Sequence, residues 1–273
     1  MTPYSREYRV ATLAAREAGA LLRAAFGNVR DVRYKGLVDP VTAADRASEA
    51  LIAERLLAAF PGDRLLAEEG SAAALNEGAE RVWVVDPLDG TVNFLHSYPV
   101  FCVSIALIAG ARTVVGVVYD PLRDELFAAQ AGHGATLNDS PLAVSATDTL
   151  LRAMLCTGFA YDPAWRQENL AYFARFIELT QGVRRDGAAA LDVAYVAAGR
   201  FDGYWERGVA VWDVAAAALI LSEAGGRLSR YDGGDFDPFS REIVASNGLL
   251  HAALLDVIAS VPAAPGVEEV NFT

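Results

Sequence analysis

The apolar residues of the first part of the chain follow a helical period in two places. Over residues 4–26 they recur every three or four positions and stop at a Gly-Asn pair, which predicts an amphipathic helix. A second helix is predicted from Thr42 to about Phe60, where a Pro-Gly pair stops it. The later predicted helices cover about 164–180, with Trp165, Leu170, Phe173 and Ile177 on one side, the alanine-rich stretch ending at Gly199, 214–224 and 248–260.

Apolar runs without that period separate the predicted helices. Residues 81–85 predict a buried strand that stops abruptly at Asp86. Residues 101–108 predict a second strand, and the runs 113–119 and 125–129 predict a hairpin. Shorter strands are predicted near 65–67, 154–159 and 201–206 and twice within 227–247, and we place the start of the second half of the chain near residue 145.

Composition adds the class of protein. The chain has 273 residues, of which 53% are hydrophobic and 21% charged, as is typical of a compact globular protein. No uncharged apolar run of about 18 residues predicts a membrane span, and the N-terminus lacks the layout of a secretion signal. Cys102 and Cys156 stand in apolar surroundings, where we expect buried thiols rather than a disulfide. The expected location is the cytoplasm.

The net charge of −12 bears on the class of partner. A nucleic-acid groove needs basic stripes, so the acidic balance argues against one. A phosphate-handling enzyme with this charge would need bound divalent metals, since its substrate is also an anion. A merely soluble surface would show the same balance, so the charge is weak evidence for a metal.

Two carboxylates follow the strand predicted at 81–85, three residues apart, in Asp86-Pro-Leu-Asp89-Gly90-Thr91. The proline fixes its own φ and Gly90 permits a backbone path that other residues resist, so both carboxylates can point the same way from one bend. Mg²⁺ prefers carboxylate oxygens in that arrangement, with waters and a substrate phosphate completing its shell. The alternative is an ordinary turn capped by its own side chains.

Four further acidic side chains stand at the ends of predicted elements. Asp45 follows Thr42 by three residues, which fits a helix capping box. Glu68 opens a Glu-Glu-Gly stretch of the kind that is usually a solvated loop, and Asp213 stands where an ordinary helix N-cap would. Glu206 ends the strand predicted at 201–206. None of these four indicates a function by itself.

The string from Asp86 to Phe94, Asp-Pro-Leu-Asp-Gly-Thr-Val-Asn-Phe, resembles the signature of the inositol monophosphatase family of Mg²⁺-dependent, lithium-sensitive phosphatases. Its Thr-Val-Asn-Phe part is more similar to the inositol-phosphatase branch than to the nucleotide-phosphatase branch, where a charged residue commonly follows the threonine. The string is nine residues long. The resemblance is therefore specific.

Three other elements extend the resemblance. Trp212-Asp213-Val-Ala, followed by Glu-Ala-Gly-Gly, is similar to the family's second signature. The Glu-Glu pair at Glu68 and the Val-Thr-x-x-Asp element ending at Asp45 occur in family order and at family spacing. The resemblance therefore covers about residues 5–260.

The resemblance implies a role for particular residues. The implied ligands of two or three Mg²⁺ ions are Glu68, Asp86, the Leu88 carbonyl, Asp89 and Asp213. The implied catalytic residues are Thr91, Asp45 and Glu68, with Thr91 backed by Asp45 orienting the attacking water and accepting its proton. The implied substrate contacts are Asp89, Gly90, Thr91, Gly187, Ala189, Glu206 and Asp213. Lys35 resembles a family residue near the metals.

The resemblance also implies a fold and an activity. The fold is a layered αβαβα sandwich of the sugar-phosphatase type, with an α+β half over 1–144 that carries the first signature and an α/β half over 145–273 that carries the second. The activity is hydrolysis of a sugar or polyol phosphate, with inositol 1-phosphate the expected substrate, by a homodimer.

Other readings remain open at this point. The same metal site could hydrolyse fructose 1,6-bisphosphate, histidinol phosphate or a nucleotide 3′-phosphate. A non-catalytic binding protein on this fold would have lost an acidic ligand, and none is missing. Ala188 stands where the family commonly has a hydroxyl residue, which removes a possible substrate hydrogen bond. We expect substrate choice to depend on Ala188, on Arg184 and Arg185, and on residues 71–80, which are expected to form a mobile surface segment.

Overall fold

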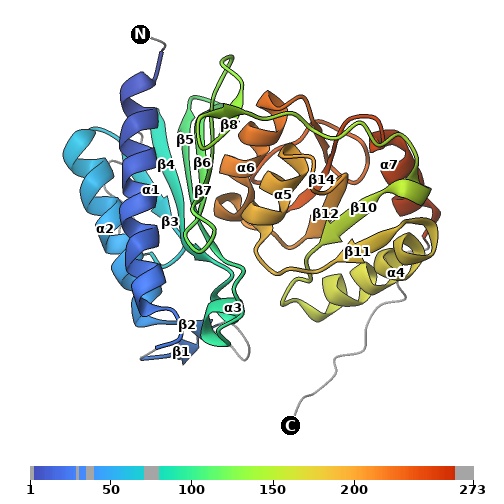
Figure 1. Ribbon diagram of the computed structural model, residues 1–273, viewed down its shortest axis with the longest axis horizontal. Coiled ribbons are helices and arrows are strands. Elements are labelled where there is room, and N and C mark those ends of the chain that lie inside the picture. The colour runs from blue at the N-terminus through green and yellow to red at the C-terminus, as the bar shows by residue number, and fades with distance from the viewer. Residues whose placement is uncertain (1–2, 29–30, 35–39, 71–79, 262–273) are drawn as a thin grey trace.

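The computed structural model describes residues 3–28, 31–34, 40–70 and 80–261. Helices and sheets alternate in five layers in the order αβαβα (Figure 1). Three clusters of buried apolar side chains hold the layers together, one on each outer side and one around the central helices. The layered α/β fold predicted from the sequence is confirmed, while the division at residue 145 stays a prediction. Within the described residues, no helix combines the length and apolar character needed to cross a membrane.

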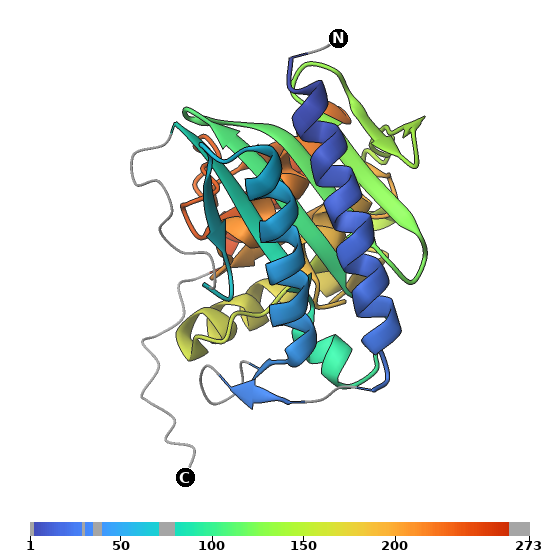
Figure 2. The same cartoon turned by 90° about the vertical axis from the view of Figure 1, so that its left-hand side faces the viewer.

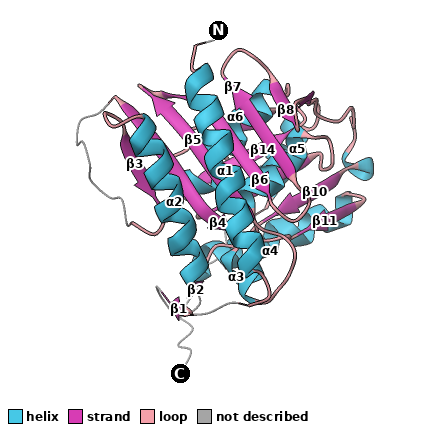
Figure 3. Ribbon diagram, turned by 60° about the vertical axis from the view of Figure 1, so that its left-hand side comes forward, coloured by secondary structure: helices cyan, strands magenta, loops and turns pink. Residues whose placement is uncertain are grey.

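The first outer layer consists of α1 (Ser5–Ala25) and α2 (Ala43–Ala59), which lie side by side across one face of a seven-stranded sheet (Figures 2 and 3). The strands lie in chain order: β3 (Arg64–Ala67), β4 (Arg81–Asp89), β5 (Cys102–Ala109), β6 (Arg112–Asp120), β7 (Glu125–Gln130), β8 (Ala135–Leu137) and β9 (Ser140–Pro141). β3 and β4 are parallel, and each later pair is antiparallel.

Both faces of β4 to β7 in the seven-stranded sheet are largely buried, which explains why these strands read as continuous apolar runs in the sequence. Along β5, Val103, Ile105 and Leu107 join the cluster under α1 and α2. Cys102 and Ala106 alternate with them and join the cluster around the central helices. Both cysteines of the chain are buried and free, as predicted.

Small residues of α1 pack against both the sheet and α2. Ala11, Ala14, Ala15 and Ala18 are fully buried, whereas Leu13 is 55% exposed. The predicted helix is present, but alanines rather than the large apolar residues form much of its core face. Short side chains allow the helix axis to lie close to its neighbours.

The second sheet has five strands in the order β11-β10-β12-β14-β13. Their bounds are β10 (Met154–Thr157), β11 (Gly182–Arg184), β12 (Gly203–Arg207), β13 (Arg227–Ser229) and β14 (Glu242–Ser246). β10 is parallel to β11 and β12, and β14 is antiparallel to β12 and β13. The outer face is covered by α4 (Pro163–Leu179) and α7 (His251–Ser260). The short elements are β1 (Arg33–Tyr34), β2 (Pro40–Val41), α3 (Thr91–Leu95) and a 3₁₀ turn (Leu150–Arg152).

α4 presents a different side to the sheet from the one that its apolar residues indicate. Phe176 and the polar Asn169 are buried, whereas Leu170 and Ile177 are 47% and 45% exposed. Asn169 faces inward because its Oδ1 accepts a hydrogen bond from Nε1 of Trp205 at 2.6 Å. The polar partner that fixes this orientation lies on a distant strand.

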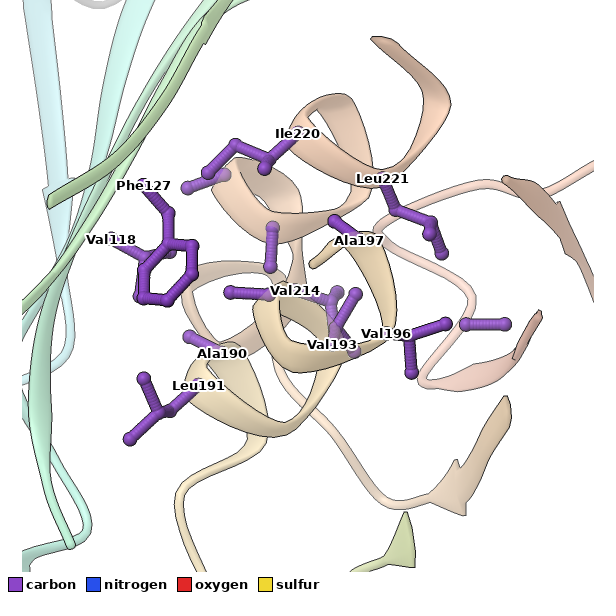
Figure 4. Packing of buried hydrophobic residues seen from close by; sticks show 14 of the residues in the cluster. Val118, Phe127, Ala190, Leu191, Val193, Val196, Ala197, Val214, Ile220 and Leu221 are labelled. Carbon is purple, nitrogen blue, oxygen red and sulfur yellow. The ribbon is translucent and has the colours of Figure 1, made fainter. Parts of the chain in front are cut away.

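The central layer consists of α5 (Ala189–Ala197) and α6 (Val211–Glu223), which pack against each other between the two sheets. Val118 and Phe127 of the seven-stranded sheet lie against these helices (Figure 4). Gly116 of β6 lies so close to α6 that an added Cβ would be 2.4 Å from the Ala216 carbonyl oxygen. The glycine therefore sets how closely the central layer approaches the first sheet.

Gly116→Ala is expected to lower the free energy of unfolding by about 1–3 kcal/mol, the usual cost of overpacking a core. The atom that would be too close belongs to the α6 backbone and cannot move without displacing that helix. Thermal unfolding of the variant checks this. Gly62→Ala is the matched control, since an added Cβ there meets nothing within 4 Å. Equal melting temperatures for both variants would contradict the close packing.

Candidate active site

A cavity of about 430 Å³ opens where β4 and β12 end and α5 and α6 begin. Every residue predicted to bind metal or substrate lines it: Glu68, Asp86, Leu88, Asp89, Gly90, Thr91, Gly187, Ala189, Glu206 and Asp213. Asp45, the remaining predicted residue, lies behind the lining and contacts Thr91. The structure thus brings together side chains that are far apart in the sequence, from both sheets.

The strand β4 continues through Asp89, so the prediction that it ends at Asp86 is wrong. The string keeps its pairing with β5 by way of an irregularity: Asp86 pairs with Ser104, Asp89 pairs with Cys102, and the register shifts between them. The Asp86 carboxylate accepts the backbone N–H of Leu88 at 3.0 Å. A bulged strand end, and not a free turn, therefore carries both carboxylates.

Asp89 joins the signature to the start of α5. Its Oδ1 accepts the N–H of Ala189 at 3.2 Å, and its Oδ2 accepts the N–H of Ala190 at 2.7 Å. The N-cap residue of α5 is Ala188, which has no side-chain oxygen to do this. The next residue, Gly90, has φ +95, a left-handed conformation that favours glycine. Asp89 thus caps a helix from another part of the chain.

Asp213 is the third residue of α6, and Ala210 is the N-cap. The sequence suggested that Asp213 itself would be the N-cap. Its Oδ2 accepts the N–H of Ala210 at 2.7 Å from the third helical position. The preceding carbonyl, of Trp212, accepts a hydrogen bond from Oγ of Ser104 at 3.0 Å. The start of α6 is thereby tied to β5, which holds Asp213 at the cavity beside the first signature.

Burial raises the pKa of the aspartates in the cavity. The pKa of Asp86 lies well above its usual value because the carboxyl is buried and faces Glu68, Asp89 and Asp213. Burial raises the pKa of Asp89 to about 6, although the hydrogen bond from the Ala190 N–H opposes the rise. Burial and the charge of Asp89 raise the pKa of Asp213 well above its usual value. The protein therefore holds negative charge here at a cost that a cation would offset.

These donors suit a hard divalent cation. Glu68, Asp86, Asp89 and Asp213 offer carboxylate oxygens and Leu88 offers a backbone carbonyl, which are the ligand types that Mg²⁺ prefers. Within the described parts of the chain, however, no three acidic, histidine or cysteine side chains already surround one point as metal ligands do. The fit is therefore one of donor chemistry and location.

Thr91 and Asp45 form a hydrogen-bonded pair beside the carboxylates. Oγ1 of Thr91 lies 3.1 Å from Oδ1 of Asp45 and 3.0 Å from the Leu88 carbonyl oxygen. The other oxygen of Asp45 accepts the hydroxyl of Thr42 at 2.5 Å and its backbone N–H at 2.9 Å. The capping box expected at Asp45 is present, and the same side chain also contacts Thr91. Burial raises the pKa of Asp45, while the hydrogen bonds from Thr42 oppose the rise.

Glu206 of β12 also lines the cavity. The hydroxyl of Tyr204 donates a hydrogen bond to its carboxylate, and burial raises its pKa to about 7. A Cβ added to Gly158 would be 2.0 Å from Oε2 of Glu206. Glycine at position 158 therefore leaves the space in which the carboxylate sits.

If Glu206 accepts a hydrogen bond from a substrate hydroxyl, as the resemblance implies, Gly158→Ala is expected to lower kcat/KM for a polyol phosphate by about 10-fold or more, because the displaced carboxylate loses that bond. Steady-state phosphate release measures the loss. Glu206→Gln, which keeps the shape of the side chain, should show a loss of similar size. Full activity in a folded Gly158→Ala protein would contradict the placement of Glu206.

Known proteins resemble the chain along nearly its whole length. The model of the inositol monophosphatase family matches residues 4–263. The chain belongs to the inositol monophosphatase family. It is therefore a phosphoric monoester hydrolase.

Relatives of this family member carry two kinds of name. A Synechocystis sp. protein named inositol-1-monophosphatase is 46% identical over 255 residues, covering 93% of this chain and 88% of that protein. A Pseudomonas aeruginosa protein named Nus factor SuhB is 43% identical, covering 91% of this chain and 94% of that protein. The solved inositol monophosphatase from Anabaena (Nostoc) sp. PCC 7120 has a TM-score of 0.87 and 45% identity, covering 96% and 99% of the two chains.

In this inositol monophosphatase family member, Asn93 has a role that the sequence did not reveal. Its Nδ2 donates to the carbonyl oxygens of Val100 at 2.8 Å and Asp186 at 2.7 Å. It thereby fixes the turn that presents Gly187, which has φ +85, to the cavity. The residue lies within the signature string, but its partner is 93 positions away.

Glu49 of α2 is a second residue that was missed. It is fully buried, and its Oε2 accepts the backbone N–H of Glu69 at 2.8 Å. The backbone N–H of Glu68 donates to the Val85 carbonyl oxygen at 3.2 Å. These two contacts hold the Glu-Glu stretch against β4, so it is not the solvated loop that its composition suggested.

The residues expected to decide substrate choice do not all line the cavity. Ala188 and Arg185 line the cavity. Arg184 donates from Nη1 to the carbonyl of Val183 at 3.4 Å and is not part of the lining. Lys35 and residues 71–79 lie outside the described residues.

Proposed function

We propose that this family member hydrolyses inositol 1-phosphate to inositol and phosphate in a Mg²⁺-dependent reaction. One observation carries the proposal: carboxylates from β4 and α6, the Thr91 hydroxyl and the Glu206 carboxylate line a single cavity. The carboxylates from β4 and α6 are suited to a metal that binds a phosphate. The Glu206 carboxylate is suited to the hydroxyl groups of an alcohol. The relative named inositol-1-monophosphatase supports the choice of alcohol.

In this proposal the metal is held by Glu68, Asp86, the Leu88 carbonyl, Asp89 and Asp213. A divalent cation there would supply positive charge against the phosphate and would lower the pKa of water in the site. Asp89 has a second task, since both its oxygens hold the start of α5. That contact supports the placement of Gly187 and Ala189, which line the same cavity and in this proposal contact the phosphate.

Thr91 acts on the attacking water. Its hydroxyl has one proton and two acceptors within reach, the Asp45 carboxylate and the Leu88 carbonyl. When it donates to Asp45, its lone pairs face the cavity and accept a hydrogen bond from a water. As the water attacks phosphorus, its proton passes to the Thr91 and Asp45 pair, which is a general-base role. The buried Thr42 contacts keep Asp45 in place.

Glu206 binds the leaving alcohol. Its carboxylate is partly buried, and the hydrogen bond from Tyr204 fixes its orientation. A substrate hydroxyl donates to this carboxylate, which an apolar leaving group cannot do. Arg185 at the same cavity adds a positive charge that attracts the anionic substrate.

The family membership supports three further parts of the proposal. We infer that Li⁺ inhibits the reaction, and that the protein acts in the cytoplasm as a homodimer. Sedimentation equilibrium tests the dimer, for which a monomer at micromolar concentration would be the contrary result.

Phosphate release from a panel of substrates tests the proposal. The panel is inositol 1-phosphate, fructose 1,6-bisphosphate, histidinol phosphate and adenosine 3′,5′-bisphosphate, each with Mg²⁺ and with Mg²⁺ plus Li⁺. The proposal predicts that inositol 1-phosphate has the highest kcat/KM and that Li⁺ lowers its rate. A higher kcat/KM for another substrate would replace inositol 1-phosphate, and release from none would favour the non-catalytic reading.

A further inference from the structure

Asp192 is a buried acid in the cavity that neither family signature includes. It lies on α5, is 1% exposed and lines the cavity that holds Glu206. Neither of its carboxylate oxygens has a hydrogen-bond partner in the described part of the protein. Other buried acids, such as Asp202, are hydrogen-bonded to backbone N–H and hydroxyl groups.

The geometry of α5 explains why Asp192 faces the cavity. Ala188 and Ala189 also line the cavity and stand four and three positions before Asp192, so the three share one side of the helix. The intervening Ala190 and Leu191 belong to the buried cluster between the sheets. Small alanine side chains precede the carboxylate on its own side, and neither can donate a hydrogen bond to it.

Most of the charged groups around Asp192 carry the same charge as its carboxylate. The charges that act on it are the carboxylates of Asp186, Asp89 and Glu206 and the opposing guanidinium of Arg185. Behind it, the thiol of Cys156 contacts the Asp192 backbone carbonyl at 3.9 Å and leaves the carboxylate unpaired. The acid therefore lies among like charges, with both oxygens buried and unpaired among the described residues.

A buried carboxylate without a partner is costly, and native proteins rarely keep one without a use. A group that brings its own donors would offset that cost on binding. The alcohol part of a polyol phosphate brings several hydroxyl donors, and Glu206 at the same cavity can accept only some of them. Asp192 thus has the chemistry, burial and position of a second acceptor for the alcohol.

We propose that Asp192 is a specificity-determining residue whose carboxylate accepts a hydrogen bond from a second hydroxyl of the leaving alcohol, beside the hydroxyl held by Glu206. The inference rests on the proposed function and narrows it to phosphate esters of alcohols that carry more than one free hydroxyl. Neither residue takes part in the proton transfer at Thr91. The role of Asp192 is binding.

Two variants and a matched pair of substrates test this. The variants are Asp192→Ala, which removes the acceptor, and Asp192→Asn, which keeps its shape. The substrates are inositol 1-phosphate and cyclohexyl phosphate, which has the same ring without hydroxyls. In Asp192→Ala we expect the ratio of the two kcat/KM values to fall by about 10- to 100-fold, the range for a hydrogen bond to a charged group.

The division of the effect between KM and kcat separates binding from a structural role. We expect KM for inositol 1-phosphate to carry most of the loss. An equal loss on both substrates, or no loss on either, would overturn the proposal. Cys156→Ala is the control for a change in packing next to Asp192. Cys156 contacts the backbone carbonyl of Asp192 and does not line the cavity. Its substrate ratio should match that of the wild type.

Thermal stability gives a second readout that does not depend on turnover. Since Asp192 has no partner to lose, Asp192→Asn is expected to keep or raise the melting temperature measured without substrate. A melting temperature several degrees lower would assign the carboxylate a structural role instead.

A failure of the proposed function would look different. If the wild type does not hydrolyse inositol 1-phosphate, that substrate assignment fails while Asp192 is still tested. Glycerol 2-phosphate and isopropyl phosphate then serve as the matched pair, since they also differ only in their free hydroxyls. An unchanged ratio for this pair in Asp192→Ala would overturn the role of Asp192.

Discussion

Asp89→Asn is expected to lower kcat/KM for inositol 1-phosphate by about 10³-fold or more while leaving the protein folded. The substitution removes one negative charge from the group proposed to hold the metal. Metal ions contribute several kcal/mol to charge stabilisation in such reactions, and each ~1.4 kcal/mol is a factor of ten in rate. Steady-state phosphate release at saturating Mg²⁺ measures the effect.

The fold should survive because asparagine keeps one acceptor oxygen. In the wild type the carboxylate accepts the N–H groups of Ala189 and Ala190, and the asparagine oxygen can still accept one of them. Neutralising a buried aspartate whose pKa is raised to about 6 also removes an unfavourable charge. We therefore expect only a small change in melting temperature.

Asp202→Asn is the matched control for Asp89→Asn. Asp202 is also buried and also accepts a backbone N–H, that of Met154 at 2.7 Å, but it is not part of the cavity lining. This variant should lose stability and keep the kcat/KM of the wild type. Normal hydrolysis by a folded Asp89→Asn protein would disprove the metal assignment.

Thr91→Val is expected to lower kcat by about 10²- to 10⁴-fold, the range for loss of general acid–base catalysis. Valine has the shape of threonine but cannot orient a water or take its proton. The Asp45 carboxylate would remain in place through Thr42, so the loss would report the missing hydroxyl. Single-turnover phosphate release measures the chemical step.

Thr91→Ser separates the hydroxyl from the methyl group. Serine can make the same contacts with Asp45 and the Leu88 carbonyl, so most of the activity should remain. If Thr91→Val and Thr91→Ser were equally active, the hydroxyl would have no part in the reaction. Equal and large losses in both would point to packing instead.

Most elements of the fold could be predicted because their hydrophobic residues follow clear patterns along the sequence. The strands from 81 to 130 read as apolar runs since both faces of their sheet are buried. Which side of a helix faces the core was harder to predict. α1 uses alanines where Leu13 is exposed, and α4 turns Asn169 inward to meet Trp205. Those choices depend on close approach and on partners from distant strands, which periodicity does not record.

The candidate site could be located from the sequence because its acids lie in short strings. Their local structure was less predictable. Asp86 and Asp89 lie on a bulged strand because pairing with β5 continues through them, and Asp213 lies inside the first turn of α6. The sequence indicated no role for Asn93 or Asp192. The partner of Asn93 is 93 positions away, and Asp192 lies in an alanine-rich helix outside any recognised motif.

The central claim is that the carboxylates around Asp89 form a metal-dependent catalytic site. Phosphate release from inositol 1-phosphate by chelator-treated protein, titrated with Mg²⁺, tests it most directly. The account predicts no release until Mg²⁺ is added, then a saturable rise that Asp89→Asn does not show. Release at the same rate with and without the chelator would contradict it.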